Sequence, residues 1–311
     1  MSTVRRVGAA VALVLAAVVL AACGAVENTD ASEQPAGAKL RLDLATKNFT
    51  ESIVMGELYK QALEQEGFTI AIRKNVGGTE VLDEKLRAGE IDAYPEYMGL
   101  AASAVAGEDV MGKSAEETSK IVRDHYATRG VVVSEETPFQ NTETVTVTSP
   151  FALTHKLRTI ADLSNLPTFT LGARPEFEAR QQGFAGLQSV YRLTNGQFVP
   201  VAADARFVAL DEGDVDASNV FSTDPQLATG NYRVLKDTEG LFGTQHAALL
   251  VNEQMLNSLG GDKFMNVVNA VNRELTQSAM IELNGQVDLE GRDPADVARQ
   301  FLQQRGLVKS G

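Results

Sequence analysis

Two hydrophobic periods alternate along this chain and limit the folds open to it. Residues 40–44 alternate apolar and polar side chains, as a strand does. Residues 48–51, Asn-Phe-Thr-Glu, predict a capping box, and apolar residues at helical spacing follow as far as Gly67, which is placed to end the helix. A second alternating segment, residues 68–72, completes a β-α-β unit. The pattern predicts an α/β protein with a mainly parallel sheet.

An internal echo suggests that this architecture occurs twice. Residues 86–93, LRAGEIDA, return in outline as residues 210–217, LDEGDVDA. Each copy predicts a helix end, a glycine stop and the start of a strand. The copies lie too far apart for a solenoid repeat. We therefore expect two lobes of similar build that share a cleft, with chance likeness in one helix-glycine-strand joint as the alternative.

Two segments are suited to carry the chain between these lobes. They are residues 142–148, TETVTVT, which are strongly β-prone, and residues 247–251, AALLV. A chain that leaves one lobe, builds the other and returns forms a two-stranded hinge, about which a cleft can close on a ligand. We predict that residues 39–143 and 247–311 form lobe 1 and that residues 144–246 form lobe 2.

The N-terminus predicts export. Arg5 and Arg6 precede an apolar run of about sixteen residues, which is short for a membrane span and typical of a signal peptide. The run ends at Cys23, the only cysteine, in a sequence that resembles the lipobox of bacterial lipoproteins. This resemblance implies a signal peptide over residues 1–22 and a lipid on Cys23 that anchors an extracytoplasmic protein to the cell membrane. A buried core cysteine is the alternative.

Composition adds further limits. Residues 23–38 are rich in small and polar side chains and predict a flexible tether. The chain carries a net charge of −13, and loss of Arg5 and Arg6 with the leader makes it −15. Such a surface disfavours nucleic acid and anionic lipid headgroups as partners. A single cysteine also allows no intrachain disulfide.

Motifs for catalysis are sparse. Residues 107–114, GEDVMGKS, match the P-loop pattern, but an Ala-rich stretch stands where a buried strand should precede them. A capping box from Ser114 to Glu117 explains the same letters. The three histidines lack metal-ligand spacing, and no G-x-S-x-G elbow occurs. We predict no metal, no cofactor and no enzymatic activity. The rivals are an extracytoplasmic enzyme and a sensory or scaffolding lipoprotein.

Several segments together resemble the glycine betaine, carnitine and choline binding proteins of osmoprotectant ABC importers. The matching stretches are KNFTE at Lys47, GGTEVL at Gly77, GEIDAYPEY at Gly89, PFQNT at Pro138, TIADL at Thr159, GARPEF at Gly172, FSTD at Phe221 and ELNGQVDLEGRDPADVA at Glu282. The resemblance implies a two-lobed, type II periplasmic-binding-protein-like fold with the ligand cleft between the lobes. It also implies a monomer that delivers a small solute to ABC permease subunits driven by a separate ATPase.

The resemblance also assigns residues to a binding site. The family holds a quaternary ammonium in a box of tyrosines by cation–π attraction and a carboxylate with basic side chains. Tyr97 matches one box position, whereas Glu143, Phe221 and Gln245 stand at or near the other three. We predict that seven side chains converge on one ligand pocket, with the two basic positions included: Lys47, Tyr97, Asn141, Glu143, Arg180, Phe221 and Gln245.

Glu143 leaves two classes of ligand open. A carboxylate in a closed cleft must find a positive partner or become protonated. If Glu143 meets the cation of the ligand, a small cationic or zwitterionic amine of the osmoprotectant type is favoured. If Glu143 instead neutralises Arg180 or Lys47, an uncharged polar or aromatic solute fits better. We favour the amine.

Overall fold

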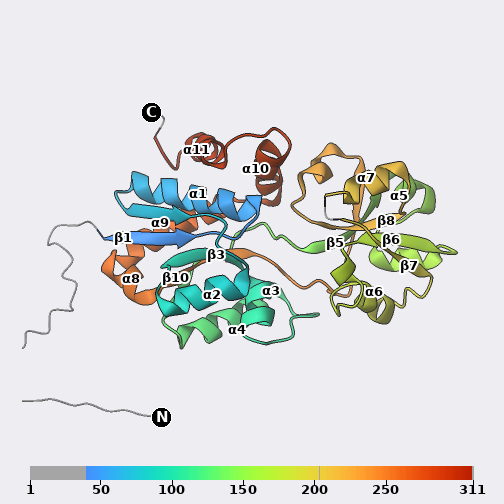
Figure 1. The fold of residues 1–311 in the computed structure, drawn as a ribbon, viewed down its shortest axis with the longest axis horizontal. Helices are drawn as coiled ribbons and strands as arrows, with labels where there is room; N and C mark the ends of the chain where they lie inside the picture. Colours follow the sequence, from blue (N-terminus) through green and yellow to red (C-terminus); the bar gives the residue numbers. More distant parts are fainter. Residues whose placement is uncertain (1–39, 203, 310–311) are drawn as a thin grey trace, which may run out of the picture. The chain divides into compact units, whose positions relative to one another are not determined.

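Two five-stranded sheets organise the chain (Figure 1). The first sheet has the order β2-β1-β3-β10-β4 and consists of β1 (Arg41–Ala45), β2 (Thr69–Arg73), β3 (Ala93–Tyr97), β4 (Val131–Val133) and β10 (Ala247–Asn252). The second has the order β7-β6-β8-β5-β9 and consists of β5 (Glu143–Thr148), β6 (Phe169–Ala173), β7 (Gly196–Pro200), β8 (Ala217–Phe221) and β9 (Tyr232–Leu235).

The two sheets have equivalent topologies. In the first, β10 runs antiparallel to both of its neighbours, and in the second β5 does the same. The other paired strands are parallel. The two reversed strands occupy the two segments that we expected to connect the lobes, so each of these segments belongs to one sheet and follows the connection instead of forming it. The predicted α/β class with mainly parallel strands is therefore confirmed.

This computed structural model describes residues 40–309, apart from residue 203, and places residues 39–311 in one compact unit of their own. The predicted signal peptide, Cys23 and the tether lie outside the described residues. Within residues 40–309, no helix has the length and apolar character needed to cross a membrane.

Helices pack against each sheet. Around the first sheet are α1 (Thr50–Gln65), α2 (Thr79–Ala88), α3 (Met98–Leu100), the π-helical turn η1 (Ala101–Val105), α4 (Ala115–Ala127), α8 (Glu253–Ser258), α9 (Gly261–Glu274), α10 (Gln277–Asp288) and α11 (Pro294–Gln304). With the second sheet are α5 (Ser149–His155), α6 (Phe184–Val190), α7 (Arg206–Glu212) and the short 3₁₀ turns η2 (Ile160–Asn165), η3 (Pro175–Phe177) and η4 (Pro225–Thr229).

Each sheet has a hydrophobic core on both faces. On the first sheet, α1, α9, α10 and α11 share one core with the strands, and α2, α3 and α4 share the other. On the second sheet, α5 and α6 contribute to one core and α7 to the other. Burial of these apolar faces provides the main driving force for folding.

The repeated segments, residues 86–93 and 210–217, adopt the same local structure, in which a helix ends at a glycine and a strand follows. Gly89 ends α2 and Gly213 ends α7, both in the left-handed region at φ 71° and φ 77°. The aspartate that follows accepts a hydrogen bond from a neighbouring parallel strand in each sheet. Asp92 accepts from the Asp43 N–H at 2.7 Å, and Asp216 accepts from the Thr170 N–H at 2.8 Å.

Two chain connections and one helix contact join the two sheets. The chain crosses through residues 134–142 and returns through residues 236–246, and an isolated bridge pairs Gln140 with His246. Helix α10 makes the third contact, because it packs against η4 and the Gln277 side chain donates to the Ser222 carbonyl at 2.9 Å. Residues from all three contacts therefore lie where the sheets face each other.

The predictions for helix ends and for the P-loop-like segment were partly right and partly wrong. The capping box at residues 48–51 is wrong, because α1 begins at Thr50 and the residue before it, Phe49, provides no side-chain cap. Gly67 has φ 90° and ends α1 as predicted. The Ser114–Glu117 capping box is also confirmed. The P-loop-like segment follows η1 and no strand precedes it directly, so it lacks the structural context of a phosphate-binding loop.

Candidate functional site

A cavity of about 600 Å³ lies between elements of the two sheets. Its lining comes from the β1–α1 junction, from β3 and the start of α2, from the two connections and from loops of the second sheet. All seven side chains that we predicted are among the lining residues: Lys47, Tyr97, Asn141, Glu143, Arg180, Phe221 and Gln245. Their contact with a ligand remains a prediction.

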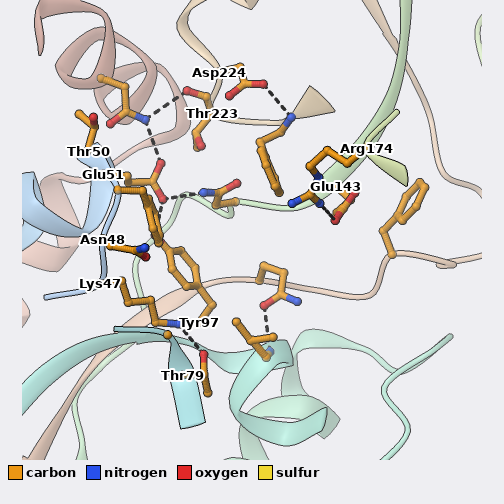
Figure 2. Close-up of a pocket in the computed structure, with 18 of the residues that line it drawn as sticks. Lys47, Asn48, Thr50, Glu51, Thr79, Tyr97, Glu143, Arg174, Thr223 and Asp224 are labelled. Carbon is orange, nitrogen blue, oxygen red and sulfur yellow. Dashed lines mark hydrogen bonds and ion pairs between the residues drawn. The ribbon is translucent and has the colours of Figure 1, made fainter. Parts of the chain in front are cut away.

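Glu51 lies at the centre of a buried hydrogen-bond network on the first-sheet side (Figure 2). It is only 2% exposed, and its Oε1 accepts from the Tyr97 hydroxyl at 2.6 Å and from Asn141 Nδ2 at 3.0 Å. Its Oε2 accepts from Asn284 Nδ2 at 2.9 Å. Among residues 40–309, no basic side chain forms an ion pair with it. Burial raises the pKa of Glu51, and hydrogen bonds from the side chains of Tyr97, Thr223, Asn284 and Asn141 partly offset that effect.

The position of Glu51 explains the wrong capping prediction. Its side chain turns towards Tyr97 and the cavity, and Ser52 accepts from the Lys47 N–H at 2.9 Å in its place. Glu51 still stands in the first turn of α1, where the helix dipole favours a negative charge. The dipole therefore helps to compensate a carboxylate that lacks a basic partner.

Lys47 is buried beside this network, and its charge is already paired. Its ammonium group forms an ion pair with Glu96, which is fully buried, and donates to Thr79 Oγ1 at 2.7 Å. The same group lies 5.1 Å from the centroid of the Tyr97 ring. Lys47 lines the cavity, but Glu96 compensates its positive charge.

The second-sheet side of the cavity is rich in arginine. The guanidinium carbons of Arg174 and Arg206 lie 5.4 Å and 5.3 Å from the centroid of the Phe221 ring. Arg206 also pairs with Asp224 at 3.4 Å. Phe221 therefore takes part in two cation–π contacts within the protein.

Glu143 resolves one open question about the charges. Its carboxylate accepts from Arg174 at 2.9 Å (Figure 2). It also lies 4.0 Å from Arg180. It therefore pairs with arginines and not with Lys47, which binds Glu96. Burial raises the pKa of Glu143, and the charge of Arg174 opposes this shift.

Asn141 and Gln245 come from the two connections between the sheets. The Asn141 N–H donates to the Gln245 carbonyl at 3.0 Å. The side-chain oxygen of Gln245 in turn accepts from the Leu100 N–H at 3.0 Å. These bonds hold the two connections side by side where they border the cavity.

The two sides of the cavity differ in charge. On the first-sheet side, the Lys47–Glu96 pair is neutral and Glu51 adds a carboxyl group without a basic partner among residues 40–309. On the second-sheet side, Arg174, Arg180 and Arg206 lie beside the carboxylates of Glu143 and Asp224, and Arg174 also lies 3.7 Å from the carboxylate of Glu176. Arg180 has the most exposed of these guanidinium groups, with its side chain 52% exposed. The cavity thus presents the buried Glu51 carboxylate on one side and the exposed Arg180 guanidinium group on the other.

Sequence reasoning missed several of the polar residues that form this site. Glu51 and Asn284 lie within stretches that carry the family resemblance, but the local sequence predicts only a helix cap for Glu51 and assigns no role to Asn284. Arg174 lies in the GARPEF stretch, yet only Arg180 was assigned to a basic position. The signal was present for all three, because each lies within or beside a segment that carries the family resemblance.

Residues 41–304 match the model of a protein family described as the substrate binding domain of ABC-type glycine betaine transport systems. The chain belongs to this family. The glycine betaine-binding protein YehZ of Escherichia coli is 27% identical over 88% of this chain and 94% of its own length. The ergothioneine transport permease/ergothioneine binding protein EgtU of Helicobacter pylori is 25% identical over 86% of this chain, which spans about half the length of that relative (48%).

Solved structures support the same fold. A crystal structure described as a glycine betaine/carnitine/choline ABC transporter superposes with a TM-score of 0.80 at 20% identity, covering 86% of this chain and 99% of that one. The predicted two-lobed, type II periplasmic-binding-protein fold is therefore confirmed. Membership of the glycine betaine substrate-binding family also confirms the predicted role as an extracytoplasmic substrate-binding protein of ABC transport.

Proposed function

We propose that this protein captures a small amine that carries a positive charge, preferably a zwitterion, and delivers it to ABC permease subunits driven by a separate ATPase. The observation that carries the proposal is the placement of two charged groups on different sides of the cavity. Glu51 provides a carboxylate on one side, and Arg180 provides an exposed guanidinium group on the other. A zwitterion can place its cation near the first and its carboxylate near the second.

The physical basis is the cost of burying charge. An isolated charge in a dry cavity is strongly unfavourable, so a ligand whose charges complement the lining restores what the site lacks. Glycine betaine, after which the relative YehZ is named, carries one quaternary ammonium and one carboxylate. A ligand that touches both sheets would also favour closure of the cleft between them.

One observation favours a second candidate, an uncharged polar or aromatic solute. Glu143 already pairs with Arg174 and lies near Arg180, which reduces the positive charge available to a ligand carboxylate. A neutral solute would leave these pairs undisturbed. It would not, however, compensate Glu51, and for this reason we rank it second.

A thermal-shift screen distinguishes these candidates. Residues 39–311 form a unit of their own, so this segment can be purified and heated with betaine, choline, carnitine, amino acids, polyamines and neutral solutes. A ligand at one hundred times its Kd stabilises by about 2.7 kcal/mol. We expect stabilisation by cationic or zwitterionic amines. Stabilisation by a sugar or a phosphate compound alone would contradict the amine proposal.

We further propose that residues 1–22 are removed as a signal peptide, that Cys23 is acylated and that residues 23–38 tether the lobes to the membrane. The support is the apolar run that ends in small residues before the single cysteine. Cys23→Ala should move the protein from the detergent phase to the aqueous phase in a phase-separation experiment. Equal retention of both proteins in the detergent phase would argue against a lipid on Cys23.

A further inference from the structure

The aromatic rings at the predicted box positions already face cations of the protein. The Lys47 ammonium group lies 5.1 Å from the Tyr97 centroid, and Phe49 stacks on the same ring at 6.0 Å. Two guanidinium groups lie 5.4 Å and 5.3 Å from the Phe221 centroid. A ring attracts a cation through the negative potential of its faces. In this protein, the faces of Tyr97 and Phe221 already interact with cationic side chains of the protein itself.

The other two box positions offer no ring. Glu143 pairs with arginine, and the Gln245 side chain is bonded to the backbone of Leu100. A ligand cation beside Phe221 would also be repelled by the two arginines that contact this ring. Phe49 and Phe242 also line the cavity, where Phe49 stacks on Tyr97 and Phe242 stacks on Phe177. At the predicted box positions, however, both rings already face cations of the protein, so a negatively charged group would add attraction that these rings do not supply.

Glu51 is suited to this task. It is almost fully buried, it lines the cavity, and no basic side chain in residues 40–309 forms an ion pair with it. A charge in such an environment acts over several ångströms, because less water screens it. We propose that Glu51 is the counter-ion of the ligand's cationic group and that its charge, more than the aromatic rings of the lining, selects cationic ligands. This inference rests on the proposed function.

The three donors around Glu51 define the kind of cation that it can attract. Tyr97, Asn141 and Asn284 occupy three of its roughly four acceptor positions and fix its orientation. The ligand therefore has little need to donate hydrogen bonds, and attraction depends on charge. A quaternary ammonium, which has no N–H group, satisfies this requirement as well as a protonated amine does.

Neighbouring charges do not replace Glu51 in this role. On the β3 side, Lys47 and Glu96 neutralise each other. Near Thr223, Asp224 is paired with Arg206. Asp288, at the end of α10, is exposed and accepts from the Thr50 hydroxyl, so water screens its charge. Glu51 is the buried carboxylate of this group without a basic partner in the described part of the chain.

A pair of isosteric ligands tests the inference. Glycine betaine and the anion of tert-butylacetic acid have the same shape, but only the first carries a positive charge. Both are titrated by calorimetry into residues 39–311 with the native sequence and with Glu51→Gln, which keeps the size and an acceptor oxygen. We expect Glu51→Gln to weaken glycine betaine by about tenfold or more, a buried-charge effect, and not to weaken the carbon isostere.

Phe221→Leu provides the matched comparison for recognition by rings. It should change the affinities for glycine betaine and for the carbon isostere by the same factor, so that the ratio of the two affinities stays constant. Glu51→Gln should instead reduce the preference for glycine betaine over the isostere. Equal weakening of both compounds by Glu51→Gln would mean a structural role and overturn the inference, as would an unchanged ratio. If the native protein binds neither glycine betaine nor any other amine of the screen, the proposed function fails, and the inference fails with it.

Discussion

The ammonium group of Lys47 is paired with the buried carboxylate of Glu96, and the lysine side chain is only 4% exposed. Family resemblance alone assigns Lys47 to the carboxylate of a ligand. The pairing indicates different roles for the two basic residues. Lys47 neutralises the buried charge of Glu96, and Arg180 is the basic residue that can bind a ligand anion. This difference can be measured through stability.

We predict that Lys47→Met lowers the free energy of unfolding by about 3–5 kcal/mol, because it leaves the Glu96 charge buried without a partner. The double variant Lys47→Met/Glu96→Gln should recover much of this loss, since neither charge then remains. Denaturant unfolding monitored by circular dichroism measures both. A loss below about 1 kcal/mol in the single variant, typical of a surface pair, would contradict the interpretation.

The affinity for choline should depend on pH. Burial raises the pKa of Glu51, and only the ionised form attracts a cation. A bound cation lowers the pKa again, so binding expels a proton when Glu51 is partly protonated. Affinity should therefore be constant above the raised pKa and fall as the pH decreases through it. Calorimetry in buffers of different ionisation enthalpy measures both the affinity and the protons released.

Choline is the suitable probe because it lacks a carboxylate that could compete for the arginines. Burial also raises the pKa of Glu143 and of Asp224, so the control must retain them. Glu51→Gln does so, and we expect it to flatten the pH dependence. The same pH slope in both proteins would assign the effect to the other two carboxylates and contradict the prediction.

Gly99 allows α3 to approach the second connection closely. A Cβ at this position would lie 2.4 Å from the Thr244 carbonyl oxygen and 2.8 Å from Gln245 Nε2. Gly99→Ala should therefore lower stability by about 1–3 kcal/mol, as overpacking does. Gly285→Ala in α10 is the control, since its nearest neighbour is Pro225 Cβ at 3.4 Å and alanine favours a helix. Equal melting temperatures for the two variants would contradict this view of Gly99.

Local features were predicted well because their causes lie within a few residues. The capping box at Ser114 and the left-handed glycines depend on neighbours along the chain, and so does the helix-glycine-strand joint that occurs twice. The equivalence of the two sheets could be inferred from that joint alone. The two segments expected to connect the lobes proved to be the strands β5 and β10, which directly follow the actual connections along the chain.

Glu51 could not be recognised in the same way. Its three donors lie 46, 90 and 233 residues away in the sequence, at Tyr97, Asn141 and Asn284. Within its own segment, Asn-Phe-Thr-Glu fits a helix cap, and no local pattern indicates that the side chain turns inward. The pairing of Lys47 with Glu96, 49 residues apart, was hidden for the same reason.

The central claim is that a ligand places its two charges on opposite sides of the cavity, and calorimetry of Arg180→Met tests it most directly. Arg180 is half exposed, so the expected effect is moderate. Arg180→Met should weaken glycine betaine by about threefold to tenfold and leave choline, which has no carboxylate, unaffected. Glu51→Gln should weaken both. Equal loss of both ligands in Arg180→Met, or no loss of either, would contradict the account.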